Sequence, residues 1–155
     1  MLHKLCDLLM EKKITVSVAE SCTGGRISSA LVSHPGISAV FLCGIVAYSN
    51  KAKIEQLNVP GDILAKYGAV SAQCAEAMAA GVRKNNGSDL AVATTGVAGP
   101  GGGSDEKPVG LVYIAISSKY GTHAEKFNFS GDREEITRAA TEKAIEMLYN
   151  EAQKL

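Results

Sequence analysis

The sequence has no tryptophan and no surplus of charge of either sign. Its 155 residues carry sixteen Lys and Arg against sixteen Asp and Glu, which gives a formal net charge of zero. Proteins that bind nucleic acids usually carry a basic surplus, and many of them stack bases on aromatic side chains. The composition therefore argues against DNA or RNA as a partner.

Long apolar runs, a cleavable leader and paired cysteines are also missing. The opening segment MLHKLCDLLMEKK has leucines at helical spacing, and no A-x-A cleavage site or membrane-spanning run follows it. The four cysteines (Cys6, Cys22, Cys43 and Cys74) are widely scattered, without a C-x-x-C pair or a nearby histidine. We therefore expect a cytoplasmic protein with reduced thiols, no contact with a membrane, and no metal or other cofactor.

What the sequence does contain is an alternation of helical and strand-like segments. The apolar, β-branched segments that predict strands are 14–19, 37–49, 88–96, 109–118 and 122–130. The segments with helical spacing begin at Leu2 and continue at 26–36, 50–58, 60–68, 71–87 and 132–153. This order predicts one α/β domain over residues 1–155, a three-layer sandwich in which a mixed β-sheet is flanked by helices.

The stretch AESCTGGR, residues 19–26, places Ser21 and Cys22 where a strand gives way to a helix. Free backbone N–H groups at a helix start can stabilise the oxyanion that a nucleophile creates, and Gly24 and Gly25 permit a close approach by a substrate. Ser21 or Thr23 could equally serve only to cap the helix. The stretch alone leaves these two interpretations open.

A serine nucleophile needs a base, and none of the three histidines in the sequence is convincingly placed for that role. The segment YSNKAK, residues 48–53, follows a predicted strand and could bring Lys51 or Lys53 to the strand end beside Tyr48. A lysine base needs a pKa lowered from about 10.4 toward 7 or 8, which requires burial or a neighbouring cation. Two lysines in a short helix are also typical of a solvated face.

The glycine-rich stretch TGVAGPGGGSDEKP, residues 95–108, is too long to be a mere connector. It lacks the G-K-[ST] ending of a P-loop and the G-x-G-x-x-G spacing of dinucleotide folds, so nucleoside triphosphates are not indicated. Its N–H groups could bind a phosphate or a carboxylate, or the stretch could be a flexible surface loop. In SGDR, residues 130–133, Arg133 at a helix start could bind an anion or pair with a neighbouring glutamate.

Five of these blocks, AESCTGG, YSNKAK, TGVAGPGGG, KPVG and FSGDR, occur in one order along residues 5–150. Together they resemble the C-terminal domain of the competence/damage-inducible protein CinA, the nicotinamide-nucleotide amidohydrolase family. The resemblance implies hydrolysis of the carboxamide of nicotinamide mononucleotide to nicotinate mononucleotide and ammonia, in salvage of the pyridine ring. It also implies a small-molecule nucleotide as the substrate and a homodimer as the assembly.

The resemblance assigns roles to individual residues. Ser21 would be the nucleophile, Lys53 the base and Tyr48 the hydrogen-bonding partner of Lys53, while Cys22 would face away and pack. The residues that would bind the substrate and its phosphate are Thr23, Gly24, Gly25, Thr95, Gly96, Gly99, Gly101, Gly102 and Arg133. Two other functions stay open: a catalytically silent module that binds a pyridine nucleotide, and an amidase that uses Cys22.

Overall fold

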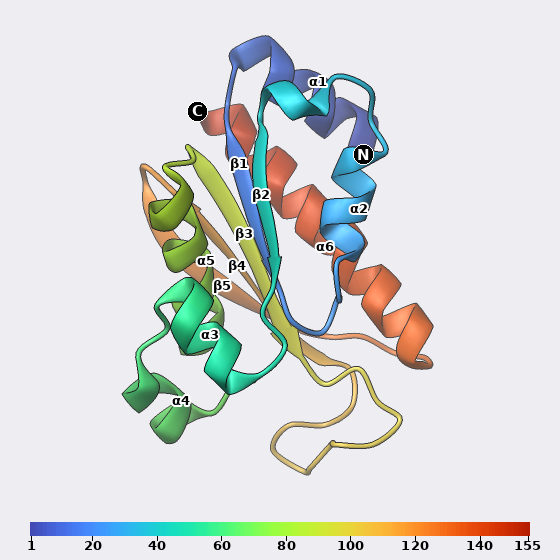
Figure 1. The fold of residues 1–155 in the computed structure, drawn as a ribbon. Coiled ribbons are helices and arrows are strands. Elements are labelled where there is room, and N and C mark those ends of the chain that lie inside the picture. Colours follow the sequence, from blue (N-terminus) through green and yellow to red (C-terminus); the bar gives the residue numbers. More distant parts are fainter.

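The computed structural model describes residues 1–155 and contains one five-stranded sheet in the order β2-β1-β3-β4-β5 (Figure 1). The central strand β1 (Val16–Glu20) pairs in parallel with β2 (Phe41–Val46) on one side and with β3 (Leu90–Gly96) on the other. β4 (Leu111–Ser118) and β5 (Gly121–Asn128) continue the sheet in antiparallel pairing. The predicted mixed sheet is therefore confirmed, and its last two strands form a hairpin.

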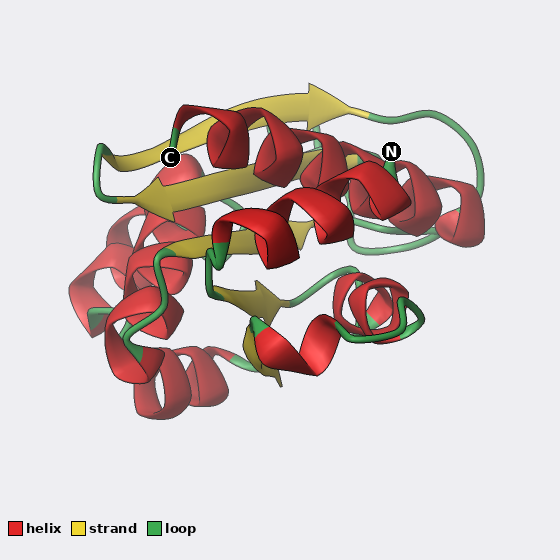
Figure 2. Cartoon of the chain, turned by 90° about the horizontal axis from the view of Figure 1, so that it is seen from above, coloured by secondary structure: helices red, strands yellow, loops and turns green.

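Helices cover both faces of this sheet, which makes the three layers that the sequence predicts (Figures 1 and 2). On one face lie α1 (Leu2–Lys12), α2 (Arg26–Val32) and α6 (Arg133–Lys154). On the other face lie α3 (Asn50–Leu57), α4 (Gly61–Tyr67) and α5 (Ala72–Asn86). No helix combines the length and the hydrophobicity that a bilayer crossing requires.

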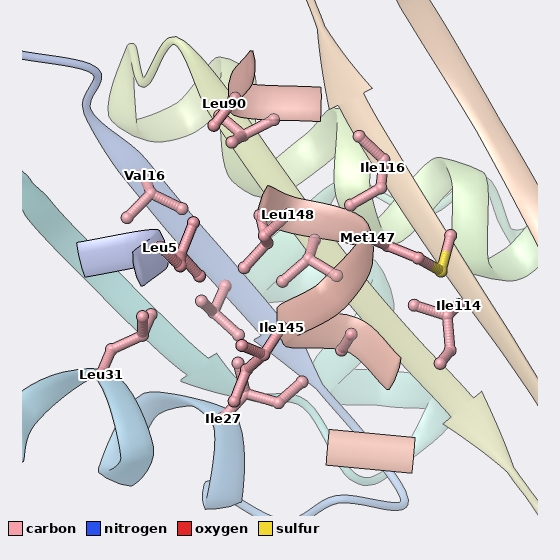
Figure 3. Close-up of a cluster of buried hydrophobic side chains, with 14 of the residues drawn as sticks. Leu5, Val16, Ile27, Leu31, Leu90, Ile114, Ile116, Ile145, Met147 and Leu148 are labelled. Atoms are coloured by element: carbon pink, nitrogen blue, oxygen red, sulfur yellow. The ribbon is translucent and has the colours of Figure 1, made fainter. Parts of the chain in front are cut away.

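The two helical layers pack against the sheet through cores of different character. The larger core holds 23 buried residues between the sheet and α1, α2 and α6, and large aliphatic side chains fill it (Figure 3). The smaller core holds 13 buried residues, and seven of these are alanines. Small side chains let α5 approach the sheet closely, and the shorter helices α3 and α4 pack against α5.

The strand predicted over residues 37–49 is shorter in the structure. Residues 37–39 form a turn of 3₁₀ helix, β2 covers only residues 41–46, and Tyr48 lies beyond the strand end. The chain then turns into α3, where Ser49 accepts a hydrogen bond from the N–H of Ala52 at 3.0 Å. A capped helix start at this point ends the strand, because the cap fixes the backbone direction of the following residues.

The topology brings three connecting segments to one edge of the sheet. Because β1, β2 and β3 are parallel, the segments that follow them, 21–25, 47–49 and 97–108, all leave from the same edge. The connection after β1 runs over one face of the sheet through α2, and the connection after β2 runs over the other face through α3 to α5. Open α/β sheets bind ligands at such a reversal, beyond the carboxyl ends of the strands.

We predict that Gly81→Ala destabilises the protein although alanine is the better helix former by about 1 kcal/mol. A Cβ at Gly81, in the middle of α5, would overlap the carbonyl oxygen of Leu57 at the end of α3. The free energy of unfolding should fall by about 2 kcal/mol, as expected for overpacking, in a urea titration. Gly101→Ala is the control, because a Cβ at Gly101 meets nothing within 4 Å. Equal stabilities would contradict the close approach of α3 to α5.

Candidate active site

A tight turn, residues 21–25, joins β1 to α2 and carries Ser21. The Ser21 N–H donates to the carbonyl of Thr94 on β3 at 3.0 Å, which fixes the start of the turn. Gly24 and Gly25 have φ values of 56° and 95°, a left-handed backbone that side chains with a Cβ rarely adopt. The glycine pair is therefore needed to turn the chain into α2, and only 8% of Ser21 is exposed.

The side chain of Glu20, the last residue of β1, fixes the conformation of this turn through hydrogen bonds. Its carboxylate is fully buried and accepts four hydrogen bonds. The donors are Thr23 Oγ1 at 2.7 Å, Ile27 N at 3.0 Å, Ser28 N at 3.0 Å and Ser28 Oγ at 2.8 Å. Two of these are first-turn N–H groups of α2, so Glu20 supplies the helix cap that the glycine before α2 cannot supply.

Lys53 reaches Ser21 from the opposite side of the sheet edge. It lies on α3, only 1% of the residue is exposed, and its Nζ donates to Ser21 Oγ at 3.1 Å. Its other hydrogen bonds go to the carbonyl oxygens of Ala47 at 2.9 Å and Tyr48 at 3.1 Å. Burial lowers the pKa of Lys53 below its ordinary value, because a charged amine is stabilised by water. The predicted choice of Lys53 over Lys51 agrees with this geometry, since Lys51 is exposed and pairs with Glu55.

The thiol of Cys22 is next to Ser21 but in a different environment. Cys22 is 6% exposed, and it packs into the larger core. Burial raises the pKa of Cys22 to about 11, despite an opposing hydrogen bond from its own backbone and another from Thr94. The thiol is therefore protonated at neutral pH, and a protonated thiol is a poor nucleophile.

The 21–25 turn leaves three backbone N–H groups free of backbone partners. Within the turn, the N–H of Gly24 donates to the carbonyl of Ser21 at 3.1 Å, and that of Arg26 to the carbonyl of Thr23 at 3.1 Å. The N–H groups of Cys22, Thr23 and Gly25 donate to no backbone carbonyl. Those of Cys22 and Thr23 directly follow Ser21 in the turn before α2, where donors can stabilise an oxyanion that forms at Ser21.

Two adjoining hollows lie at this edge of the sheet, and Ser21 lines the inner one. The inner pocket has a volume of about 230 Å³, and its lining includes both Ser21 and Lys53. The other residues that line it are Cys22, Tyr48, Ala69, Val70, Thr95, Gly96, Ala98 and Arg133. The outer pocket has a volume of about 580 Å³ and is lined by Ala98, Pro100, Val109, Gly131, Asp132, Arg133 and Glu134. Ala98 and Arg133 belong to both, so the two hollows adjoin at these residues.

Arg133 is held in place by the glycine-rich loop and by Tyr48. Its Nη1 donates to the carbonyl of Gly99 at 2.7 Å, and its Nη2 donates to the Tyr48 hydroxyl at 3.0 Å. Arg133 forms no ion pair with Glu134 or Glu135 within 4 Å, which leaves its positive charge available to a ligand. The hydroxyl of Tyr48 thus bonds Arg133, and Lys53 bonds the Tyr48 carbonyl. The contact between Tyr48 and Lys53 that the resemblance implies is therefore made by the Tyr48 carbonyl, and the Tyr48 hydroxyl accepts from Arg133.

Several residues predicted to bind substrate have other contacts or lie elsewhere. Thr23 is fully buried, and its hydroxyl contacts Glu20 and, at 2.8 Å, the hydroxyl of Thr94. The hydroxyl of Thr95 lines the inner pocket but donates to the carbonyl of Ala69 at 2.8 Å. Gly24 and Gly25 shape the turn without lining either hollow, whereas Gly96 lines the inner pocket. Gly101 and Gly102 lie on the exposed part of the loop, outside both hollows.

Sequence reasoning missed two features of the site. Ala69 and Val70, between α4 and α5, form part of the inner pocket wall, and nothing in their residue types points to a site. The second feature is the cap that Glu20 forms on α2, which its place directly before the S-C-T-G-G stretch could have suggested. Elsewhere in the chain, His, Cys, Asp and Glu side chains form no group of three or more that could hold a metal ion.

Comparison with known proteins gives consistent matches along the chain. The family model described as CinA C-terminal domain matches residues 1–152. A putative competence-damage inducible protein of Clostridium perfringens is 48% identical over 148 residues, covering 96% of this chain and 36% of that protein. A CinA-like protein of Dictyoglomus thermophilum is 50% identical over 142 residues, covering 92% of this chain and 34% of that protein. The chain thus spans about a third of the length of these curated relatives.

Solved structures match the fold over nearly its full length. The crystal structure of a CinA superfamily protein from Klebsiella pneumoniae superposes with a TM-score of 0.94 at 31% identity, covering 99% of this chain and 96% of that one. The structure of the competence/damage inducible protein CihA from Agrobacterium tumefaciens gives a TM-score of 0.89 at 42% identity, covering 95% and 93%.

We predict that the stability difference between wild type and Lys53→Met changes with pH. Because burial lowers the pKa of Lys53, the unfolded chain binds more protons than the folded one between that lowered pKa and about 10.4. The wild type should therefore gain free energy of unfolding, relative to the variant, as the pH rises through this window. Urea titrations from pH 7 to 10.5 measure the difference.

Lys51→Met is the matched control for this experiment, because the Lys51 side chain is 81% exposed on the same helix. Its stability difference from wild type should stay nearly constant over the same pH range. A constant difference for Lys53→Met as well would mean that burial does not perturb that amine.

Proposed function

The chain belongs to the CinA C-terminal domain family, and we propose that it is an amidohydrolase that converts nicotinamide mononucleotide to nicotinate mononucleotide and ammonia. The observation that carries this proposal is the buried Lys53 amine, 3.1 Å from the hydroxyl of Ser21, with no carboxylate within ion-pair distance. Burial lowers the pKa of this amine and so favours its neutral form, which is the form that can accept a proton. The pair therefore has the parts of a serine–lysine catalytic dyad.

In the first half of the reaction, neutral Lys53 takes the proton of the Ser21 hydroxyl while Oγ attacks the carboxamide carbon. Two carbonyl acceptors, Ala47 and Tyr48, fix the amine, so its remaining direction points toward Oγ. The N–H groups of Cys22 and Thr23 would donate to the oxyanion that forms. These donors need no reorganisation, because the hydrogen bonds to Glu20 already hold the turn.

In the second half, protonated Lys53 returns its proton to the amide nitrogen, the C–N bond breaks and ammonia leaves. The resulting covalent intermediate is an ester that joins the carboxyl group of nicotinate mononucleotide to Ser21 Oγ. A water molecule then attacks the ester carbon as Lys53 takes one of its protons, and the C–Oγ bond breaks. Lys53 gives that proton back to Oγ, which restores Ser21 and releases the carboxylic acid product.

The two hollows support a nucleotide rather than a free amide as the substrate. The inner pocket, about 230 Å³, suits a single aromatic ring with its carboxamide, and the outer pocket of about 580 Å³ offers room for a sugar and a phosphate. Arg133 lines both hollows and is oriented by Gly99 and Tyr48. A guanidinium in this place, beside the start of α6, favours an anionic group.

Assembly as a homodimer stays a prediction.

The two alternative functions have less physical support. A silent binding module would have no need for a buried amine facing a serine, and burying an amine without a carboxylate is costly. An amidase using Cys22 would need a thiolate, but burial raises the pKa of that thiol to about 11. Both alternatives give outcomes that differ from the serine mechanism in the next experiment.

We predict that purified wild type releases ammonia from nicotinamide mononucleotide and that Ser21→Ala and Lys53→Met lower kcat by at least about a thousandfold. Cys22→Ala and Lys51→Ala are the controls and should keep most of the activity. Coupled detection of ammonia, with circular dichroism to verify folding, makes the comparison. Turnover by Ser21→Ala that is lost in Cys22→Ala would transfer the chemistry to the thiol. Binding of the nucleotide without turnover by wild type would favour the silent module.

We predict that the effect of Arg133→Met depends on the phosphate of the substrate. With nicotinamide mononucleotide, KM should rise about thirtyfold, because a charge-assisted contact to the phosphate is lost. With nicotinamide riboside, which has no phosphate, wild type and variant should have nearly the same KM. A similar rise for both substrates would show that Arg133 acts through the fixed positions of Gly99 and Tyr48 rather than by binding phosphate.

A further inference from the structure

Three successive backbone carbonyls, those of the last residue of α4 and of the two residues after it, each accept a hydrogen bond from a side chain. The pairs are Lys107 Nζ to Tyr67 O at 2.6 Å, Ser71 Oγ to Gly68 O at 2.8 Å, and Thr95 Oγ1 to Ala69 O at 2.8 Å. Loop carbonyls are usually satisfied by water or by nearby residues. This connection, residues 67–70, is instead held from three directions.

The connection matters because it forms one wall of the inner pocket. Ala69 and Val70 line that pocket beside Ser21 and Lys53. Ser71 and Thr95 hold the connection from within the compact domain, since Ser71 caps α5 and Thr95 lies on β3. Lys107 differs from both, because it comes from the glycine-rich loop and its contact spans 40 positions of sequence.

The glycine-rich loop is supported at its ends more than at its middle. The N–H of Gly110 donates to the carbonyl of Val97 at 2.7 Å, and a Cβ at Gly103 would meet Val109, whereas a Cβ at Gly101 or Gly102 would meet no atom within 4 Å. Its first limb is fixed where Gly99 accepts from Arg133, and its second limb is fixed where Lys107 binds Tyr67 O. A small turn sets the direction of Lys107: Ser104 Oγ accepts from its N–H at 3.0 Å, and its carbonyl accepts from the N–H of Ser104 at 2.9 Å.

We propose that Lys107 is a positioning residue that clamps the glycine-rich loop to the 67–70 connection and so holds the inner pocket wall at Ala69 and Val70 in its binding position. The effect on catalysis rests on the proposed function. Lys107 lines neither hollow, so it acts on the substrate through the wall and not by contact. The clamp gives a role to the KPVG block, which the dyad and Arg133 leave without one.

The first test measures the clamp without any substrate. Glu106 is exposed and directly precedes Lys107, so a glutamate-specific protease can cut the loop when the second limb opens. Lys107→Met keeps the length of the side chain and removes its hydrogen bond. We expect its cleavage at Glu106 to be about tenfold faster than in wild type, because a charge-assisted hydrogen bond is lost. Lys107→Arg should be cleaved at nearly the wild-type rate.

Lys66→Met is the matched control. Lys66 is an exposed lysine in the last turn of α4, and its amine lies 5.2 Å from the centre of the Tyr67 ring without bonding a carbonyl. The Lys66→Met variant removes one positive charge from the same region but keeps the hydrogen bond from Lys107 to the Tyr67 carbonyl. Cleavage at Glu106 and alkylation of Cys22, which lines the inner pocket, should both stay at the wild-type rate in this control.

The second test separates positioning from mere loop stability. In Lys107→Met, the KM for nicotinamide mononucleotide should rise about fivefold while kcat stays within about twofold, because the wall binds the ring and the dyad is untouched. Alkylation of Cys22 by iodoacetamide should also become faster. Faster cleavage with unchanged KM and unchanged Cys22 alkylation would overturn the positioning role. Unchanged cleavage would overturn the clamp.

The two proposals can fail separately. If wild type shows no turnover, the amidohydrolase proposal fails, and the cleavage and alkylation rates of Lys107→Met still decide whether the clamp holds the pocket wall.

Discussion

The active-site geometry depends on one constraint: an amine has been taken out of water with no carboxylate to pair with it. Lys53 is surrounded by oxygens that carry only partial charge, from Ser21, Ala47 and Tyr48. Such acceptors satisfy its hydrogen bonds but stabilise a full positive charge less than a carboxylate would. Burial therefore dominates and lowers the pKa of the amine. The short segment between β2 and α3 presents two of its carbonyls, those of Ala47 and Tyr48, to the Lys53 amine.

Both short helices of the site begin with fixed caps, and this fixes the two halves of the dyad independently. Ser49 caps α3 and sets the direction from which Lys53 enters the core. Glu20 caps α2 from the end of β1 and sets the path of the chain around Ser21. Helices this short are marginal without caps and tertiary packing. The close approach of α5 to α3, which leaves no room for a Cβ at Gly81, holds Lys53 against the sheet.

The sequence was sufficient for the fold, because periodicity and turn residues are local signals. For the proposed dyad, the residues alone left Lys51 or Lys53 and Ser21 or Cys22 open, and the family resemblance chose Ser21 and Lys53. Alternating strand-like and helical segments predicted the layers and the mixed sheet. The sequence was insufficient where a role depends on packing between distant elements. The partner of the Tyr48 hydroxyl is Arg133, 85 positions away, and the wall at Ala69 and Val70 is built from small apolar side chains that carry no chemical signal. The family resemblance placed Thr23 among the substrate-binding residues. Its hydroxyl is instead buried and hydrogen-bonds to Glu20 and Thr94.

Two buried ionisable groups flank Ser21, and their separation determines what the site can do. The Glu20 carboxylate lies on the α2 side of the sheet, and its oxygens accept hydrogen bonds from N–H and O–H donors there. Lys53 comes from α3 on the other side of the sheet. A direct pair would stabilise both charges, raise the pKa of Lys53 and leave it unable to take a proton from serine. The strand end of β1 lies between the two layers and keeps them apart. The same reversal of chain direction that places the pocket at this edge also keeps the amine apart from the carboxylate, as the proposed role of Lys53 as a base requires.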